Sequence, residues 1–235
     1  MAAMIRTIPS ESLVKRLREH RFFQTLSDDH LRGLAAVATC YRFAPGELIL
    51  LDGEPSAGLW IINRGQVKVF KTSPEGEEHI LHLLGAGDAF NDIAALDGGP
   101  NPASAAALSA VTACNLSHAA LVDAIQRDPT LALTLIRFLS ERTRSLVAQV
   151  EALALHSART RVARFLLKQL ENPTLSAPAI TRATIAAHLG IKPETLSRAL
   201  ASLEHLEAIA VRRTEITILQ PDLLRVVALL DHDSD

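Results

Sequence analysis

Near the start of the chain, apolar residues recur three and four positions apart, the spacing of amphipathic helices. Leu31 and Leu34 are one such pair, and Ser27 precedes them where an N-cap would stand. A similar group follows a serine at position 10. The pattern therefore predicts two short helices over residues 10–38.

After residue 38 the apolar residues no longer recur at helical spacing, and turn residues become frequent. Nine of the 11 glycines fall between Gly46 and Gly99, which leaves no room for a long helix. Short β-prone runs at near-even spacing are typical of a closed all-β unit, a sandwich, roll or barrel. The runs are residues 48–51, 59–62, 66–71 and 79–84.

A long helix follows Asp128-Pro129, a pair that suits a helix start. Its apolar positions repeat at alternating spacings of four and three, the heptad pattern of a coiled coil. Leu135, Phe138 and Val147 lie off this seam, so we expect the helix to pack on the β unit and on a second copy of the chain. The seam consists of Ala132, Ile136, Leu139, Thr143, Leu146, Val150 and Leu153.

Residues 180–206 have the pattern of two short helices joined by a tight turn. Gly190 stands where the first helix must stop, and Pro193 suits the first turn of the second. Leu196, Leu200 and Leu203 then form one apolar face. The pattern predicts a helix-turn-helix whose second helix presents its first turns to DNA.

The outer face of that second helix carries side chains that can contact base edges. Arg198 can donate two hydrogen bonds to guanine, and Glu194 can accept from the cytosine amino group. These residues are four apart, so a plain surface ion pair is the alternative interpretation. The predicted DNA-contacting residues are Thr181, Arg182, Lys192, Glu194, Thr195, Ser197, Arg198, Arg212 and Arg213.

The last two of these arginines lie in a predicted wing. Residues 209–211 and 215–219 alternate as strands around the turn that holds Arg212 and Arg213, and these cations can reach phosphates. The whole pattern predicts an α+β fold: a closed all-β unit with N-terminal helices over 1–127, a dimerisation helix over 128–155, and a winged helix-turn-helix over 156–235. A hinge between the long helix and the DNA-binding module is expected at 155–157.

Composition agrees with a globular protein. The 235 residues are 48% hydrophobic and 21% charged, with a net charge of −2. No signal peptide or membrane-spanning run is visible, so a cytoplasmic protein without membrane contact is expected. Residues 156–219 hold nine Lys and Arg against five Glu, a modest basic excess. No GxSxG, HExxH or phosphate loop points to an enzyme.

The motif Glu194-x-x-Ser197-Arg198 resembles the fumarate-nitrate-reduction branch of the cyclic-AMP receptor protein (Crp/Fnr) superfamily of transcription regulators. The resemblance extends from about Phe23 to about Leu224. It implies an effector-binding β-roll, a homodimer and a palindrome of TTGAT-type half-sites in double-stranded DNA. If the protein activates transcription, RNA polymerase is a further expected partner.

Cyclic AMP fits the predicted pocket poorly. Relative to the superfamily pattern, Asn91 and Asp92 replace Gly and Glu, and Ala103 replaces the arginine that holds the phosphate. Without that guanidinium a buried phosphate loses its strongest partner. A Thr-Ser pair that meets adenine has also become apolar on the long helix. The predicted effector-pocket residues are Phe90, Asn91, Asp92, Ala103, Ser104, Leu146 and Val147.

The two cysteines, Cys40 and Cys114, are expected to be reduced thiols in a core, and two thiols cannot hold the iron–sulfur cluster of the oxygen-sensing branch. Residues 73–81 (SPEGEEHIL) and 188–195 (HLGIKPET) resemble the dissimilatory nitrate respiration regulators, proposed to sense nitric oxide through haem. The candidate haem ligands are His20, His79 and His82. Another small-molecule effector, a cyclic nucleotide, or DNA binding without any effector are the alternatives.

Overall fold

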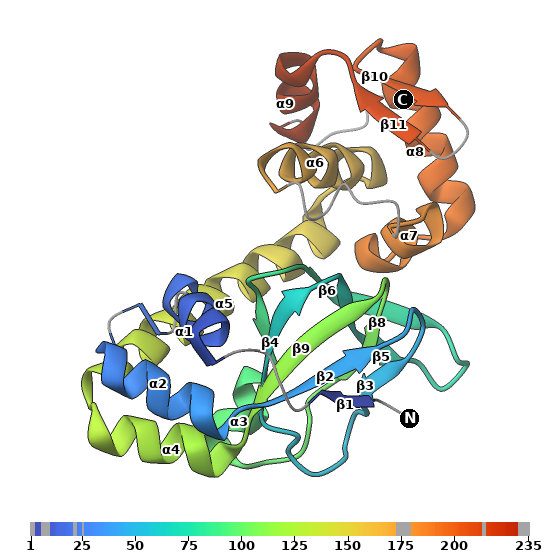
Figure 1. Ribbon diagram of the computed structural model, residues 1–235. Coiled ribbons are helices and arrows are strands. Elements are labelled where there is room, and N and C mark those ends of the chain that lie inside the picture. Colours follow the sequence, from blue (N-terminus) through green and yellow to red (C-terminus); the bar gives the residue numbers. More distant parts are fainter. Residues whose placement is uncertain are drawn as a thin grey trace. The chain divides into compact units, whose positions relative to one another are not determined.

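The computed structural model describes residues 3–5, 10–20, 23–24, 26–172, 180–212 and 215–229. The chain forms two compact units, residues 1–71 with 81–143 and residues 72–80 with 144–235. The predicted α+β class is confirmed, because helices accompany antiparallel sheets (Figure 1).

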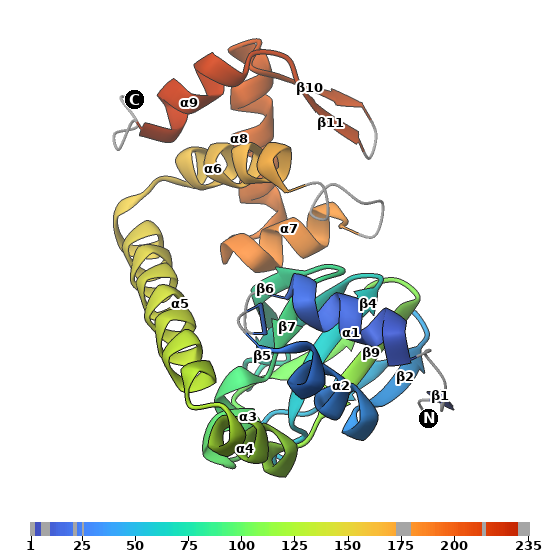
Figure 2. The ribbon, with the colours of Figure 1, turned by 60° about the vertical axis from the view of Figure 1, so that its left-hand side comes forward.

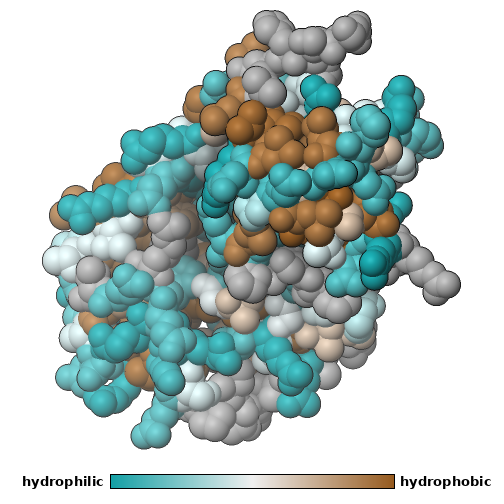
Figure 3. All heavy atoms as spheres, turned by 90° about the horizontal axis from the view of Figure 1, so that it is seen from above, coloured by the Kyte–Doolittle hydropathy of each residue, from teal (hydrophilic) through white to brown (hydrophobic). Residues whose placement is uncertain are grey.

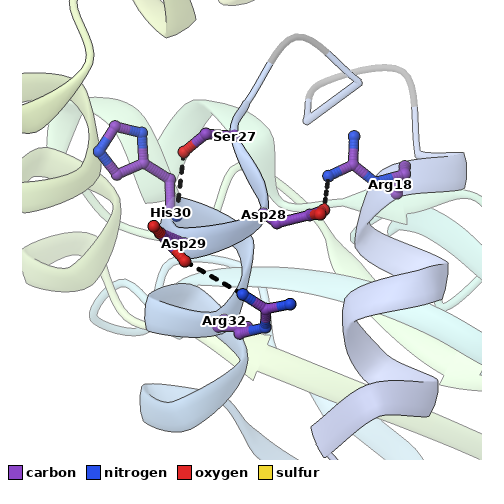
Figure 4. Close-up of polar contacts among 6 residues, drawn as sticks. All are labelled: Arg18, Ser27, Asp28, Asp29, His30 and Arg32. Carbon is purple, nitrogen blue, oxygen red and sulfur yellow. Dashed lines mark hydrogen bonds and ion pairs between the residues drawn. The ribbon is translucent and has the colours of Figure 1, made fainter.

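The two predicted N-terminal helices are present as α1 (Ser10–Glu19) and α2 (Asp28–Val37). Ser27 caps α2 as expected, because its hydroxyl accepts a hydrogen bond from the His30 amide at 3.3 Å (Figure 4). Arg18 pairs with Asp28 across the two helices. The close-up therefore shows how the start of α2 is fixed relative to α1.

The strands of the first unit form two antiparallel sheets, as the short β-prone runs predict. One has the order β1-β2-β9-β4-β7 and the other the order β3-β8-β5-β6 (Figure 1). The strands of the first are β1 (Ala3–Ile5), β2 (Thr39–Phe43), β9 (Val111–Leu116), β4 (Leu59–Arg64) and β7 (Ala89–Phe90). Those of the second are β3 (Leu48–Leu50), β8 (Ser104–Ala107), β5 (Val67–Thr72) and β6 (Glu78–Leu84).

The β4 strand is buried on both faces, which explains its continuous apolar run. Trp60 and Ile62 point into the core between the two sheets, with Phe90 and Ala105. The alternate residue Ile61 points to a second core beneath the helices. Gly58, just before β4, has φ +78°, and an added Cβ would meet the Leu116 carbonyl oxygen, so only glycine fits this turn.

Three helices complete the first unit and lead out of it. These are α3 (Asp92–Asp97), α4 (His118–Arg127) and α5 (Thr130–Leu155). The Asp128 carboxylate accepts from the Thr130 amide at 3.1 Å and so caps the long helix at its predicted start. Leu131, Leu135 and Phe138 are buried in the core beneath the helices, so α5 packs on the β unit there, but Val147, the third predicted off-seam residue, is exposed.

The second unit carries the predicted reader module (Figure 2). Its elements beyond α5 are α6 (Ala158–Glu171), α7 (Arg182–Leu189), α8 (Pro193–His205), β10 (Ile209–Arg212), β11 (Glu215–Ile218) and α9 (Pro221–Leu229). The α6 helix packs against α8 and α9. α5 ends at Leu155 and α6 begins at Ala158, where Ser157 is the N-cap.

Some large apolar side chains of the second unit stay exposed. Figure 3 shows a group of hydrophobic side chains on the face seen from above, bordered by hydrophilic ones. Within the described residues, no helix is both long and apolar enough to cross a membrane. Among the described residues beyond the long helix, the exposed large hydrophobic side chains of this unit are Leu170, Leu206, Leu219, Val226 and Leu229.

The prediction that the two cysteines are reduced thiols is wrong. Cys40 and Cys114 are buried in the core as expected, but they form a disulfide. The cause is the register of two neighbouring strands, which places Cys40 of β2 directly opposite Cys114 of β9. The two cysteines are far apart in the sequence, so local spacing does not indicate that they pair.

Candidate nucleic-acid interface and effector pocket

The turn between α7 and α8 is built by local signals in the sequence. The Thr181 hydroxyl accepts from the Thr184 amide at 3.2 Å and caps α7. Gly190 ends that helix with φ 62°, in the left-handed region. Pro193 occupies the first turn of α8, where its missing N–H removes no helix bond.

A part-buried hydrogen bond from α6 supports this turn. The Arg161 guanidinium of α6 donates to the Leu189 carbonyl at 2.9 Å, which satisfies a carbonyl at the C-terminal end of α7. Burial lowers the pKa of Arg161 from its ordinary value. This role could not be predicted from the sequence, because Arg161 appears there only as one of several cations at the start of α6.

The first turns of α8 present polar side chains to solvent. Glu194, Ser197 and Arg198 are exposed, and the opposite face is buried through Leu196, Leu200 and Leu203, as predicted. The Arg198 guanidinium lies 3.4 Å from the Thr195 hydroxyl. The described contacts of Glu194 and Arg198 include no ion pair between them, so both remain open to a ligand.

The other predicted DNA-contacting residues surround this face. Lys192 and Thr181 are exposed, and Arg182 is half-buried. In the wing, exposed Arg212 stands opposite Glu215 in the strand register. Arg213 lies outside the described residues. The Glu204 carboxylate accepts from the Val211 amide at 2.9 Å and so ties the wing to α8.

The wing begins with a residue in an unusual backbone conformation. Glu207 has φ 57°, a left-handed conformation that side chains other than Gly and Asn rarely adopt. The tight turn after α8 therefore holds a glutamate rather than a glycine.

His188 of α7 is a half-buried histidine of the same unit. Its ring centroid lies 5.6 Å from that of Phe165. Its Nδ1 lies 3.0 Å from the carbonyl oxygen of Ile80, a residue that groups with this unit. Burial lowers the pKa of His188, against a smaller raising effect of the Ile80 hydrogen bond.

In the first unit, five of the predicted pocket residues are all buried. Asn91 precedes α3 with φ 64°, and its amide donates to the Gly58 carbonyl at 2.9 Å and to Asn101 Oδ1 at 3.0 Å. The Ser104 hydroxyl accepts from the Asp52 amide at 3.1 Å. The five residues are Phe90, Asn91, Asp92, Ala103 and Ser104.

Asp92 supplies the buried charge of this region. Its carboxylate Oδ1 lies 3.8 Å from a guanidinium nitrogen of Arg142 on α5, and its Oδ2 has no hydrogen-bond partner in the described structure. Sequence reasoning missed Arg142 and the buried Asn101, because neither stands in a motif. The remaining predicted pocket residues, Leu146 and Val147, belong to the second unit and are exposed.

The three candidate haem ligands differ in environment. His20 is buried, and its ring centroid lies 5.7 Å from that of Phe23. His79 and His82 are both half-buried on β6. The described residues contain no group of three or more His, Cys, Asp or Glu arranged to hold a metal ion.

Two family models match the chain. The cyclic nucleotide-binding domain matches residues 41–128, and the Crp-like helix-turn-helix domain matches residues 160–227. The cyclic AMP receptor protein of Thermus thermophilus is 30% identical over 186 residues, which cover 79% of this chain and 86% of that protein.

Solved structures agree with these matches. FixK2 from Bradyrhizobium japonicum has a TM-score of 0.72 and 24% identity, covering 83% of this chain and 98% of that one, and it shares the fold. The sensor domain of the transcriptional regulator DNR from Pseudomonas aeruginosa has a TM-score of 0.54 and 26% identity, covering 59% and 93% of the two chains. The chain belongs to the Crp/Fnr superfamily of transcription regulators and carries the helix-turn-helix DNA-binding domain of that family.

Proposed function

We propose that this regulator binds a palindrome of TTGAT-type half-sites as a homodimer, with α8 as the helix that contacts bases. The observation that carries the proposal is the exposed face of Glu194, Ser197 and Arg198 on a helix whose start is fixed by Gly190 and Pro193. A guanidinium and a carboxylate that form no ion pair with each other, in the first turns of such a helix, match guanine and cytosine edges. Thr181, Arg182, Lys192, Thr195 and the wing arginines would contact phosphates or flank this face.

Fluorescence anisotropy with labelled DNA tests this proposal. Arg198→Ala is expected to remove the preference for the TTGAT palindrome over a scrambled duplex, whereas Arg212→Ala weakens binding to both duplexes alike. The matched control is Arg225→Ala, which removes one exposed cation from α9. Full discrimination by the Arg198 variant would refute the assignment of α8.

The homodimer is supported by the seam of α5. Ile136 is 58% exposed and Val150 is 66% exposed, although both are large apolar side chains on a helix. Thr143 and Leu153 are also exposed on this seam, while Leu139 is half-buried. An apolar stripe at heptad spacing is the feature that pairs helices in a coiled coil.

Analytical ultracentrifugation tests the dimer. Val150→Asp places a charge in the seam and is expected to shift the protein to monomers at micromolar concentration. Val226→Asp is the control, since Val226 is similarly exposed on α9, away from the seam. If the Val150→Asp and Val226→Asp variants contain equal fractions of dimer, the proposed role of α5 is contradicted.

We further propose residues 1–127 as the effector-sensing domain, 128–155 as the dimerisation helix and 156–235 as the reader, in the cytoplasm where DNA is available. Effector binding would change the populations of two dimer arrangements. Alanine in place of a guanidinium side chain at position 103 disfavours cyclic AMP, the ligand after which the Thermus relative is named. RNA polymerase is the further partner if the protein activates transcription.

Haem-mediated nitric oxide sensing is one candidate for the effector, supported by the likeness to the DNR sensor domain. An anaerobic haem titration followed by absorbance, with and without nitric oxide, tests it. A saturable spectrum with one haem per subunit that responds to the gas supports it and leads to variants of His20, His79 and His82. Unsaturable binding excludes haem and leaves another small molecule, or no effector.

A further inference from the structure

The disulfide between Cys40 and Cys114 lies in the core that supports the long helix. Cys114 is fully buried and Cys40 is 5% exposed. The same core contains Leu131, Leu135 and Phe138 of α5. Because this core is closely packed, the covalent state of the two sulfurs affects the surface on which the first half of α5 rests.

The compartment makes this bond unusual. A regulator that binds DNA works where glutathione and thioredoxin keep thiols reduced, and disulfides in such proteins are usually catalytic or redox-sensing. This step rests on the proposed DNA-binding function. Purely structural disulfides are typical of secreted proteins, and a DNA-binding regulator does not work in that oxidising environment.

We propose that Cys40 and Cys114 form a reversible thiol-oxidation site that is closed by a peroxide and reopened by a dithiol reductant. In the closing reaction the Cys40 thiolate attacks one oxygen of hydrogen peroxide and the O–O bond breaks. With one proton from solvent, the products are a Cys40 sulfenic acid and one water. The Cys114 thiol then attacks the Cys40 sulfur, the S–S bond forms, the S–O bond breaks, and the hydroxyl leaves with the thiol proton as a second water. In the opening reaction the reductant becomes a disulfide, and both cysteines return to thiols.

Of the two sulfurs, Cys40 lies on the strand nearer the edge of the sheet. β2 is covered on one side by β1, an edge strand of three residues in which Ile5 pairs with Cys40. Short edge strands separate from a sheet at much lower free energy than its centre. Cys114, in the next strand inward, stays enclosed, so Cys40 is the sulfur that meets oxidant or reductant first.

Asn63 favours Cys114 as the leaving thiolate when the disulfide is reduced. This asparagine is 4% exposed on β4, and its side-chain amide donates to the Cys114 sulfur at 2.9 Å. A donor at that position stabilises the thiolate that leaves when a reductant attacks Cys40, and a better leaving thiolate speeds the exchange. Asn63 is therefore a positioning residue for the opening reaction.

The test uses the full-length wild-type protein in two states, so it does not depend on a variant that folds. The protein is reduced anaerobically with a dithiol, or reduced and then treated with hydrogen peroxide. Each sample is then unfolded in denaturant, and alkylation with iodoacetamide followed by intact mass measurement counts the free thiols. We expect two alkyl groups in the first state and none in the second, and two alkyl groups in both states would overturn the proposal.

DNA binding by the same two samples measures the consequence. The Kd for the palindrome is expected to differ about fivefold or more between them, the range of ordinary allosteric coupling. Equal Kd values for the disulfide and dithiol forms would show that the cysteine pair does not control DNA binding. If neither form binds DNA, the proposed function fails, while the thiol count still decides whether the site exists.

Two variants refine the result. The double variant Cys40→Ala/Cys114→Ala is the control, expected to show one Kd whatever the treatment. Asn63→Leu keeps the volume and removes the donor, so the dithiol should reduce the bond several-fold more slowly. A merely structural role for Asn63 would lower thermal stability and leave the reduction rate unchanged.

Discussion

The Asp92 carboxylate at the start of α3 lies 3.8 Å from the Arg142 guanidinium of α5. The carboxylate is almost fully enclosed, and the arginine side chain is 22% exposed. Arg142 also lies over the Phe138 ring, at 5.8 Å from the ring centroid. One cation therefore neutralises the buried charge in the predicted effector pocket and links that pocket to the long helix.

Removal of this cation should destabilise the first unit. Arg142→Leu leaves the Asp92 carboxylate buried without a partner, which costs about 3 kcal/mol at neutral pH. Urea denaturation measures the loss. In an Asp92→Asn background the same substitution should cost much less, because no charge is then left unpaired. Arg137→Leu, which removes an exposed arginine of the same helix, is the control, and equal losses in both backgrounds would refute the ion-pair account.

The turn before the wing offers a stabilising substitution. Glu207 has φ 57°, a conformation that costs roughly 1–2 kcal/mol for a residue with a Cβ. Glu207→Gly should therefore raise the free energy of unfolding of the second unit by about 1 kcal/mol, part of the gain being offset by the more flexible unfolded chain. Thermal unfolding is the measurement. Glu207→Ala keeps the Cβ and should show no such gain, so equal gains for both variants would show that the side-chain charge is the cause.

Asn91 has nearly the same backbone conformation and should respond in the opposite direction. Its φ is 64°, but its amide makes two hydrogen bonds in the interior, to Gly58 and Asn101. Asn91→Gly relaxes the backbone and leaves two buried acceptors without this donor, at about 1 kcal/mol or more each. The net effect is a loss of stability of the first unit, measurable by urea denaturation. A stabilised Asn91→Gly variant would mean that these hydrogen bonds contribute little.

The local parts of this structure could be predicted from the sequence, and the long-range parts could not. Thr181, Gly190 and Pro193 act on their own neighbours in the chain, so their spacing alone locates the helix-turn-helix. Asp92 meets Arg142, and Cys40 meets Cys114, only because distant segments become neighbours in the fold. Local periodicity contains no information about which strands pair, and for that reason the redox state of the cysteines was predicted wrongly.

The pH dependence of the second unit follows from His188. Burial lowers the pKa of this histidine in the folded protein below the ordinary value of about 6.5 in the unfolded chain. The unfolded state therefore binds a proton more readily, and stability falls as the pH drops from about 6.5 towards the folded pKa. Above that window both states are neutral and this contribution to stability is complete. His188→Asn keeps a donor for the Ile80 carbonyl, so it should flatten this part of the profile. Urea denaturation between pH 5 and pH 8 is the measurement, and an unchanged slope in the variant would assign the pH dependence to another group.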